Sequence, residues 1–246
     1  MERIAIFAAL QWECRPVLRN LRQVIRARGE HFTVWRAALR EREVWVVKTG
    51  MGMQQAAVAA RAVSETGRFA LFLSTGCAGA LAPELAPGDL TVATCIVGDA
   101  SDGRFETDAP QRAHVRRVAD GAGLRVTEGP VLCSPHMLAS VDAKRTAAVR
   151  GSVAVEMEGA AIAACAAETG IPFVSVRAIL DTADTELRHA GKFIDPRSGA
   201  VRPLALASYL AMHPGALPDL LAMQRMMKAA QASLETFFAA WFGAAL

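Results

Sequence analysis

The sequence predicts one α/β layered domain, because short buried strands and helices alternate along a chain that is too apolar to be disordered. Its 246 residues are 52% hydrophobic and 21% charged, which is enough to form a single packed core. Five runs rich in Ile, Val, Leu and Phe are continuous enough to be strands covered on both faces. These runs are residues 4–8, 44–47, 71–73, 90–92 and 173–179.

Two helical stretches lie between these strands. Residues 53–66 carry apolar side chains near helical spacing and stop at Gly67, and residues 158–169 stop at Gly170. Strands that alternate with helices are typical of a layered α/β sheet. We therefore expect residues 1–246 to form one domain.

The remaining segments are interpreted as loops and a helical extension. The polar stretches 99–112 and 184–203 are predicted loops, and from about residue 203 the chain becomes helical and strongly apolar. Such a stripe is usually buried, either on the protein's own core or on a second subunit. The alternative is a wall for a lipid-like substrate or a patch that contacts a membrane. The stripe consists of Leu220, Met223, Met227, Leu234, Phe237 and Trp241.

Charge and cysteine content exclude several classes of protein. The net charge is +3 and no dense basic run contains interleaved aromatic residues, so we expect no nucleic-acid partner. Five scattered cysteines without a C-x-x-C pair favour neither a disulfide framework nor a zinc site, and five histidines lack metal-ligand spacing. We expect no metal or other cofactor. No apolar segment reaches the ~20 residues of a membrane span, and a reducing cytoplasm is the expected location.

Two glycine-containing segments follow predicted strands and are candidate ligand-binding loops. Residues 49–52 precede a helix, where backbone N–H groups hold anions or approach a sugar closely, although Gln55 breaks the dinucleotide-binding fingerprint. Residues 74–79 repeat the arrangement with small side chains. The predicted contact residues are Gly52, Cys77, Ala78 and Gly79. Alone, each segment is typical of an ordinary turn, and Cys77 of a small core residue.

Two carboxylates, Glu156 and Glu158, stand in an otherwise apolar stretch. Burial of an uncompensated charge is costly, so such residues need a reason to be there. In an extended backbone both side chains point to one face, which puts at least one carboxylate in a pocket. The alternative is an exposed helix start, where the helix dipole favours acids.

Asp181 and Glu13 each follow an apolar strand. Open α/β sheets bind ligands at the carboxyl ends of their strands. Loss of water around Asp181 would raise its pKa and keep a proton available for general acid catalysis, while the alternative is a helix N-cap. Glu13 alone is typical of a solvated acid in the first turn of a helix.

Together these segments resemble the nucleoside phosphorylase and nucleosidase family, in particular its methylthioadenosine/S-adenosylhomocysteine nucleosidase branch. The motifs that carry the resemblance are AALQWE at 8–13, KTGMG at 48–52, STGCAGALAP at 74–83, VEME at 155–158 and VRAILDTAD at 176–184. The resemblance implies a three-layer fold with a central mixed β-sheet flanked by helices, and a homo-oligomer. It also implies cleavage of the bond between a purine and its ribose.

By this resemblance, Glu13 activates the attacking water, Asp181 protonates adenine N7 and Glu158 accepts hydrogen bonds from ribose hydroxyls. Met157 packs against the sugar and the base, and Glu156 belongs to the same substrate site. These roles fit the chemistry, because a departing purine needs a proton and an oxocarbenium-like sugar needs a nearby carboxylate. An apolar pocket for Asp181 and a wetter one for Glu13 would supply the protonation states required.

The sequence also departs from the family pattern. Phosphorylases typically carry an arginine where Ser74 stands, so with Glu13 retained the sequence favours hydrolysis over phosphorolysis. Cys77 and Leu180 replace serines of the nucleosidase pattern, and the loss of a hydroxyl next to Asp181 alters base recognition.

The segment after Asp184 is longer than in the small nucleosidases and resembles the hopanoid-associated phosphorylase branch, whose proposed substrate is adenosylhopane. A pentacyclic triterpene on the 5′ carbon requires an apolar channel, and methionines provide adaptable walls. The methionines of the tail are Met212, Met223, Met226 and Met227.

The sequence therefore predicts an enzyme that cleaves the N-glycosidic bond of a 5′-substituted adenosine with water and without a metal. Its expected substrate is a small purine nucleoside, and more specifically one that carries a lipid on the 5′ carbon. An alternative role of the apolar tail is peripheral contact with the inner membrane. The alternatives are a phosphate-dependent purine nucleoside phosphorylase and a nucleoside- or lipid-binding protein that has lost catalysis.

Overall fold

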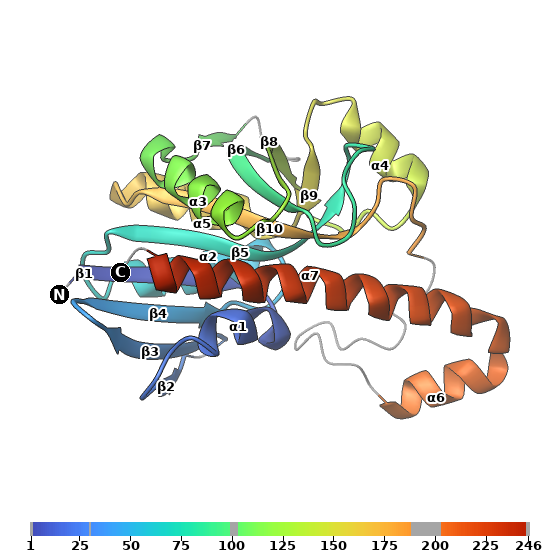
Figure 1. Ribbon diagram of the computed structural model, residues 1–246, viewed down its shortest axis with the longest axis horizontal. Helices are drawn as coiled ribbons and strands as arrows, with labels where there is room; N and C mark the ends of the chain where they lie inside the picture. The colour runs from blue at the N-terminus through green and yellow to red at the C-terminus, as the bar shows by residue number, and fades with distance from the viewer. Residues whose placement is uncertain (1, 30, 99–102, 188–202, 245–246) are drawn as a thin grey trace.

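One mixed β-sheet with helices on both faces organises the protein and confirms the predicted fold class (Figure 1). The computed structural model describes residues 2–29, 31–98, 103–187 and 203–244. The strands are β1 (Glu2–Ala8), β2 (Ile25–Arg28), β3 (Thr33–Leu39), β4 (Arg42–Lys48), β5 (Leu71–Ala80), β6 (Leu90–Gly98), β7 (Arg104–Glu106), β8 (Val126–Cys133), β9 (Ala154–Glu156) and β10 (Phe173–Asp181). The helices are α1 (Gln11–Leu18), α2 (Met53–Ser64), α3 (Ala109–Gly121), α4 (Val141–Ala148), α5 (Gly159–Thr169), α6 (Pro203–Met212), the 3-10 turn η1 (Pro214–Ala216) and α7 (Leu217–Ala244).

The strand pairing brings the ends of distant strands to one edge of the sheet. Among the described strands the order is β10-β6-β8-β9-β5-β1-β4-β3-β2. β1 runs parallel to β4 and β5, and β5 runs parallel to β10, so the carboxyl ends of these strands lie together. β10 also pairs with β6, and the pairings through β8 and β9 return to β5 and close a ring.

The central strands are buried on both faces, which explains their continuous apolar runs. In β1, Ile4 and Ile6 belong to one core cluster, while Ala5 and Phe7 belong to another on the opposite face. Residues of α1, α3 and the second half of α7 complete the first cluster. Small side chains of α2 and α5 complete the second cluster. The two helical layers therefore fix the sheet between them.

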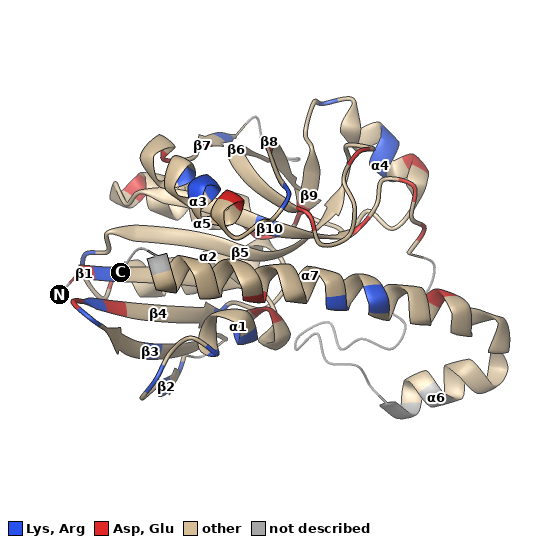
Figure 2. Cartoon of the chain, viewed as in Figure 1, with Lys and Arg blue, Asp and Glu red and all other residues tan. Residues whose placement is uncertain are grey.

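The apolar tail is helical, as predicted, and its second half packs on the protein's own core. Leu234, Phe237 and Trp241 are buried in the first cluster. In contrast, α6 and the first turns of α7 extend away from the sheet (Figure 1), and Met212 and Leu221 are 70% and 49% exposed. Figure 2 shows no charged residue in the described part of α6. Within the described ranges, no helix has the length and hydropathy needed to cross a membrane.

Two loop predictions are wrong. Residues 74–79 lie inside β5 and not after it, because this strand of small residues is paired with β10 on one side and with β9 on the other. The segment 99–112 contains β7 and the first turn of α3, where the Asp108 side chain accepts a hydrogen bond from Gln111 N at 2.9 Å and caps the helix. Residues 188–202, which form most of the other predicted loop, lie outside the described residues.

Candidate active site

A cavity of about 180 Å³ lies at the ends of β1, β5, β9 and β10. Its volume is several times the ~30 Å³ that one water molecule occupies in the liquid, so there is room for an organic ligand. The predicted site residues that line it are Glu13, Cys77, Ala78, Gly79, Glu156, Met157, Glu158 and Asp181. Apolar side chains on the same walls are Trp12, Met51, Met137, Leu138, Leu180 and Leu187. Of the described residues that line the cavity, none comes from α6 or α7.

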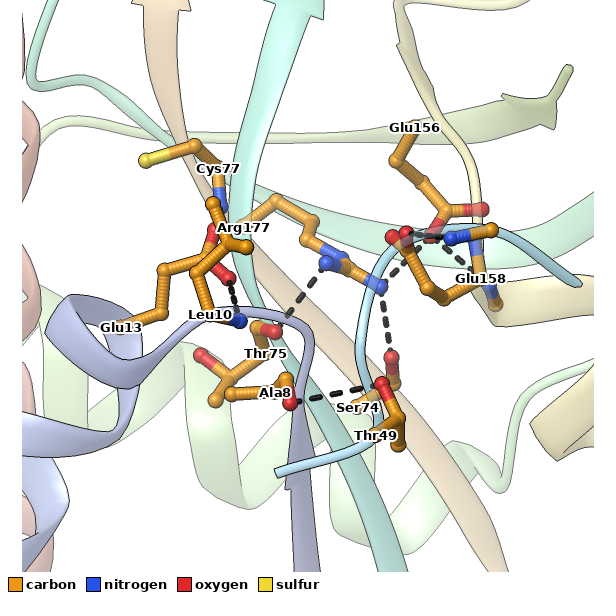
Figure 3. Close-up of polar contacts among 12 residues, drawn as sticks. Ala8, Leu10, Glu13, Thr49, Ser74, Thr75, Cys77, Glu156, Glu158 and Arg177 are labelled. Carbon is orange, nitrogen blue, oxygen red and sulfur yellow. Dashed lines mark hydrogen bonds and ion pairs between the residues drawn. The ribbon is translucent and has the colours of Figure 1, made fainter. Parts of the chain in front are cut away.

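Glu13 is held in the cavity by backbone groups of two elements. It lies in the first turn of α1, where one carboxylate oxygen accepts a hydrogen bond from Leu10 N and the other accepts one from Cys77 N, both at 2.9 Å (Figure 3). Its side chain is buried, so the solvated first-turn acid is the wrong interpretation. Burial raises the pKa of Glu13, although the Cys77 N–H and the Arg177 charge oppose that rise.

Glu156 and Arg177 form a buried ion pair beside Glu13. Arg177 Nη2 donates to Glu156 Oε2 at 2.6 Å and to Ser74 Oγ at 2.7 Å, and Nη1 donates to the Thr75 carbonyl at 3.1 Å. Glu156 Oε2 also accepts hydrogen bonds from two backbone N–H groups at the start of α5. The other carboxylate oxygen, Oε1, is buried without a protein partner. Glu156 therefore fixes the start of α5 through Oε2 and leaves Oε1 without a hydrogen-bond partner in the protein.

Glu158 occupies the N-cap position of α5 and is buried, not exposed as in the helix-start alternative. Its Oε1 accepts a hydrogen bond from Gly52 N at 2.7 Å. Gly52 therefore holds the Glu158 side chain and does not line the cavity itself. Its φ of 89° lies in the region that favours glycine, as expected where the backbone closely approaches another group. Burial and the charge of Glu156 raise the pKa of Glu158 to about 7.

Asp181 ends β10 and is buried, as the sequence predicts. Burial raises its pKa, while a hydrogen-bonded ion pair with Lys144 of α4 opposes the rise. The predicted contrast between an apolar pocket for Asp181 and a wetter one for Glu13 is wrong, because these residues are 3% and 4% exposed. Their environments differ in their partners: backbone N–H groups hold Glu13, and an ammonium holds Asp181.

Cys77 lines the cavity next to Glu13. Burial and the Glu13 charge raise the pKa of its thiol well above the usual value. A thiol kept protonated in this way is a poor nucleophile, even though His136 lines the same cavity. The structure therefore supports Cys77 as a small wall residue.

A family model described as the phosphorylase superfamily matches residues 3–200, which includes every acid of the cavity. The chain belongs to the phosphorylase superfamily.

Among its relatives, the 5′-methylthioadenosine/S-adenosylhomocysteine nucleosidase of Staphylococcus aureus strain MRSA252 is 26% identical over 200 residues, which cover 74% of this chain and 88% of the relative. The corresponding nucleosidase of Neisseria meningitidis, solved with methylthio-immucillin-A, is 20% identical with a TM-score of 0.78 over 100% of both chains. The S-adenosylhomocysteine nucleosidase of Streptococcus pyogenes, solved with 5-methylthiotubericidin, is 23% identical with a TM-score of 0.73, covering 96% of this chain and 95% of the other. These two solved structures share the fold of this phosphorylase-superfamily member.

Sequence reasoning missed the two cations of this phosphorylase-superfamily site. Arg177 interrupts a predicted buried strand, and a charge there was a signal that an acidic partner lies inside the core. Its guanidinium contacts Ser74, the position where superfamily phosphorylases were expected to carry an arginine of their own. Lys144 gave no such signal, because it stands among Asp142, Arg145 and Thr146 in a segment that looks solvated.

Proposed function

We propose that this chain hydrolyses the N-glycosidic bond of a 5′-substituted adenosine and releases adenine. The observation that carries the proposal is that three buried acids, Glu13, Glu158 and Asp181, line one cavity. The nucleosidase relatives named above support it. In this mechanism Asp181 donates a proton to adenine N7, Glu158 accepts hydrogen bonds from ribose hydroxyls, and Glu13 takes a proton from the attacking water.

The burial of these acids suits the chemistry of a departing purine. As the bond between C1′ and N9 breaks, its electron pair moves to the base, and the sugar becomes an oxocarbenium-like cation. A proton held by Asp181 neutralises the base, and nearby carboxylates stabilise the cation in a site with little water. Water then adds to C1′ and gives its proton to Glu13.

Water suits this cavity better than phosphate does. The guanidinium of Arg177, which is paired with Glu156, already donates to Glu156, Ser74 and Thr75. No Lys or Arg is among the described residues that line the cavity, so a phosphate dianion next to Glu13 would meet carboxylates there. Hydrolysis is therefore the proposed reaction.

The 5′ substituent in this proposal is apolar, with adenosylhopane as the candidate substrate. Support comes from the cavity wall, where Leu138, Leu180 and Leu187 contribute apolar surface and Met137 is 48% exposed. Because no described residue of α6 or α7 lines the cavity, this support comes from the end of β10 and the loops around the site and not from the tail methionines.

The test measures free adenine from adenosine, methylthioadenosine and a long-chain 5′-alkyl adenosine, each with and without phosphate. We expect release without phosphate and the highest kcat/KM for the long-chain substrate. Strict dependence on phosphate would make the protein a phosphorylase. Tight binding without release, unchanged in Asp181→Asn, would make it a binding protein.

A Met137→Gln variant tests the apolar wall separately. It should lower kcat/KM for the long-chain substrate by about tenfold, the effect of one or two lost methylene contacts, and leave adenosine unchanged. Val149→Gln, at the exposed C-cap position of α4, is the matched control. An equal loss of kcat/KM for both substrates would contradict the proposal that this wall contacts the 5′ group.

Peripheral membrane contact through α6 and the start of α7 is the remaining part of the proposal, supported by exposed Met212, Leu217 and Leu221. The measurement is flotation with phosphatidylcholine and phosphatidylglycerol vesicles, comparing the full chain with Met212→Ser and with Val58→Ser, an exposed control on α2. Only Met212→Ser should float less. If it changes the sedimentation mass instead, a homo-oligomer covers this surface.

A further inference from the structure

Lys144 is a buried cation directly beside the proposed acid. It lies in α4, is 1% exposed, and donates to Asp181 Oδ2 and to the carbonyl oxygens of Thr182 at 2.8 Å and Thr185 at 2.9 Å. An ammonium carries three N–H donors, and each has an acceptor here. A neutral amine has only two, which would leave one acceptor unsatisfied. The geometry therefore gives every N–H donor of the Lys144 ammonium an acceptor.

The same lysine joins α4 to the chain that follows β10. Leu187 N donates to the Ala139 carbonyl at 2.8 Å just before α4, so the segment after Asp181 is fastened to α4 at a second point. Leu187 and Asp181 line the cavity, whereas Lys144 is not among the lining residues. Lys144 thus contacts Asp181 from behind and leaves the cavity side of the carboxyl to a ligand.

We propose that Lys144 is a positioning residue for the acid: its ammonium holds Asp181 Oδ2, aims Oδ1 at the leaving purine, and stabilises the carboxylate left after proton transfer. This inference rests on the proposed function. In the step concerned, the O–H bond of Asp181 breaks and a bond from that hydrogen to N7 forms, while the C1′–N9 electron pair moves onto the purine. Lys144 keeps its three hydrogens throughout, and the proton taken up by Glu13 from water returns to Asp181 through solvent exchange.

Other titratable groups face Asp181 across the cavity. They are Glu13 from α1, Cys77 from β5, His136 from the loop after β8, and Glu156 and Glu158 at the end of β9 and the start of α5. Among the described residues, Lys144 is the cation that forms an ion pair with Asp181. Burial raises the pKa of Asp181, and Lys144 lowers it. Removal of the ammonium therefore makes Asp181 a weaker acid that keeps its proton to higher pH.

The experiment compares the wild type with Lys144→Met, Lys144→Gln and Lys144→Arg. Activity on methylthioadenosine is measured as kcat and KM over pH. In the Met and Gln variants the alkaline limb of the kcat profile should move up by about 1–3 pH units, the usual effect of losing an adjacent opposite charge. At neutral pH kcat should fall about tenfold or more, within the ~10²–10⁴-fold contribution of a general acid, with KM little changed. The Arg variant should restore the limb, and Arg145→Gln, an exposed neighbour on α4, should leave the profile unchanged.

A second substrate separates positioning from a merely structural role. A p-nitrophenyl riboside leaves as a stable phenolate and needs no proton from Asp181, so the Met and Gln variants should cleave it as fast as the wild type. Equal losses on both substrates with an unmoved alkaline limb would overturn the proposal. If the Met variant does not fold, the Gln variant, which keeps N–H donors without the charge, gives the same comparison.

A spectroscopic readout distinguishes failure of this inference from failure of the proposed function. The carboxylic C=O stretch that disappears in Asp181→Asn can be titrated by difference infrared spectroscopy without any turnover. Its midpoint should lie at higher pH in Lys144→Gln than in the wild type, and an unchanged midpoint would overturn the inference. A shifted midpoint without adenine release would support the coupling of Lys144 to Asp181 but contradict a catalytic role for either residue.

Discussion

Replacement of Glu158 by glutamine should stabilise the protein in a pH-dependent way. Glu158 is 6% exposed, and burial together with the Glu156 charge raises its pKa from 4.5 to about 7. The folded chain therefore binds this proton more tightly than the unfolded chain does. A group of this kind contributes its full stability below the unfolded pKa and loses it as pH rises through the folded pKa.

The magnitude follows from the difference between the two pKa values. They differ by about 2.5 units, and each unit corresponds to about 1.4 kcal/mol, so ionisation of Glu158 costs up to about 3 kcal/mol of folding free energy above pH 7. The glutamine keeps a carbonyl oxygen that accepts from Gly52 N, and it has no charge to bury. We expect Glu158→Gln to match the wild type near pH 4.5 and to exceed it by up to about 3 kcal/mol above pH 7.

Urea unfolding of both proteins over this pH range measures the difference directly. Glu13 and Asp181 also have pKa values raised by burial, but both proteins keep these acids, so the comparison isolates the Glu158 charge together with its repulsion from Glu13. Glu168→Gln, at an exposed position of the same helix, is the matched control. A stability difference that is constant with pH, or that falls as pH rises, would refute this account of Glu158.

Three other measurements test the site. Glu13→Gln should lower kcat for adenine release by about 10²–10⁴-fold, the usual contribution of a general base, whereas Glu43→Gln, in an ion pair with Arg3 far from the cavity, should not. A near-normal rate in the first variant would contradict the role of Glu13. Arg177→Met breaks the buried ion pair and should lower the unfolding free energy by about 3–5 kcal/mol, measured by urea unfolding against exposed Arg117→Met. A loss equal to that of the control would show that the pair is not needed for stability. Because burial raises the pKa of the Cys77 thiol, iodoacetamide at neutral pH should alkylate Cys77 far more slowly in the folded than in the urea-unfolded protein, measured by peptide mass spectrometry. Equal rates would contradict a half-buried, protonated thiol.

The elements that the sequence predicted well are those whose signal is local. The strands that became β1 and β10 are continuous apolar runs, and helix α5 has an αL glycine, Gly170, immediately after its last residue. In each case the local pattern indicates either a strand that is buried on both faces or the end of a helix. Pairing in the sheet then lengthens the strands beyond the apolar run, as in β5, which continues through the small residues to Ala80.

The elements that the sequence did not predict depend on partners distant in the chain. The exposed edge strand β2 has no apolar run, and it is defined by its antiparallel pairing with β3. The short strand β9 exists because β5 and β8 flank it. Neither pairing has a signal in the segment itself, since hydrogen bonds between strands require only backbone groups.

The sequence by itself indicated which acids enter the cavity, because Asp181 and the pair at 156 and 158 stand in apolar surroundings, where burial of a carboxylate needs a compensating reason. Only the tertiary structure decided which group holds each acid. Backbone N–H groups hold Glu13, Arg177 holds Glu156, and Lys144 holds Asp181, each from a different element. The physical reason is that the hydrophobicity of a segment is enough to indicate that its acid will be buried. The group that compensates the buried acid comes from a distant segment, and the two meet only after the sheet has formed.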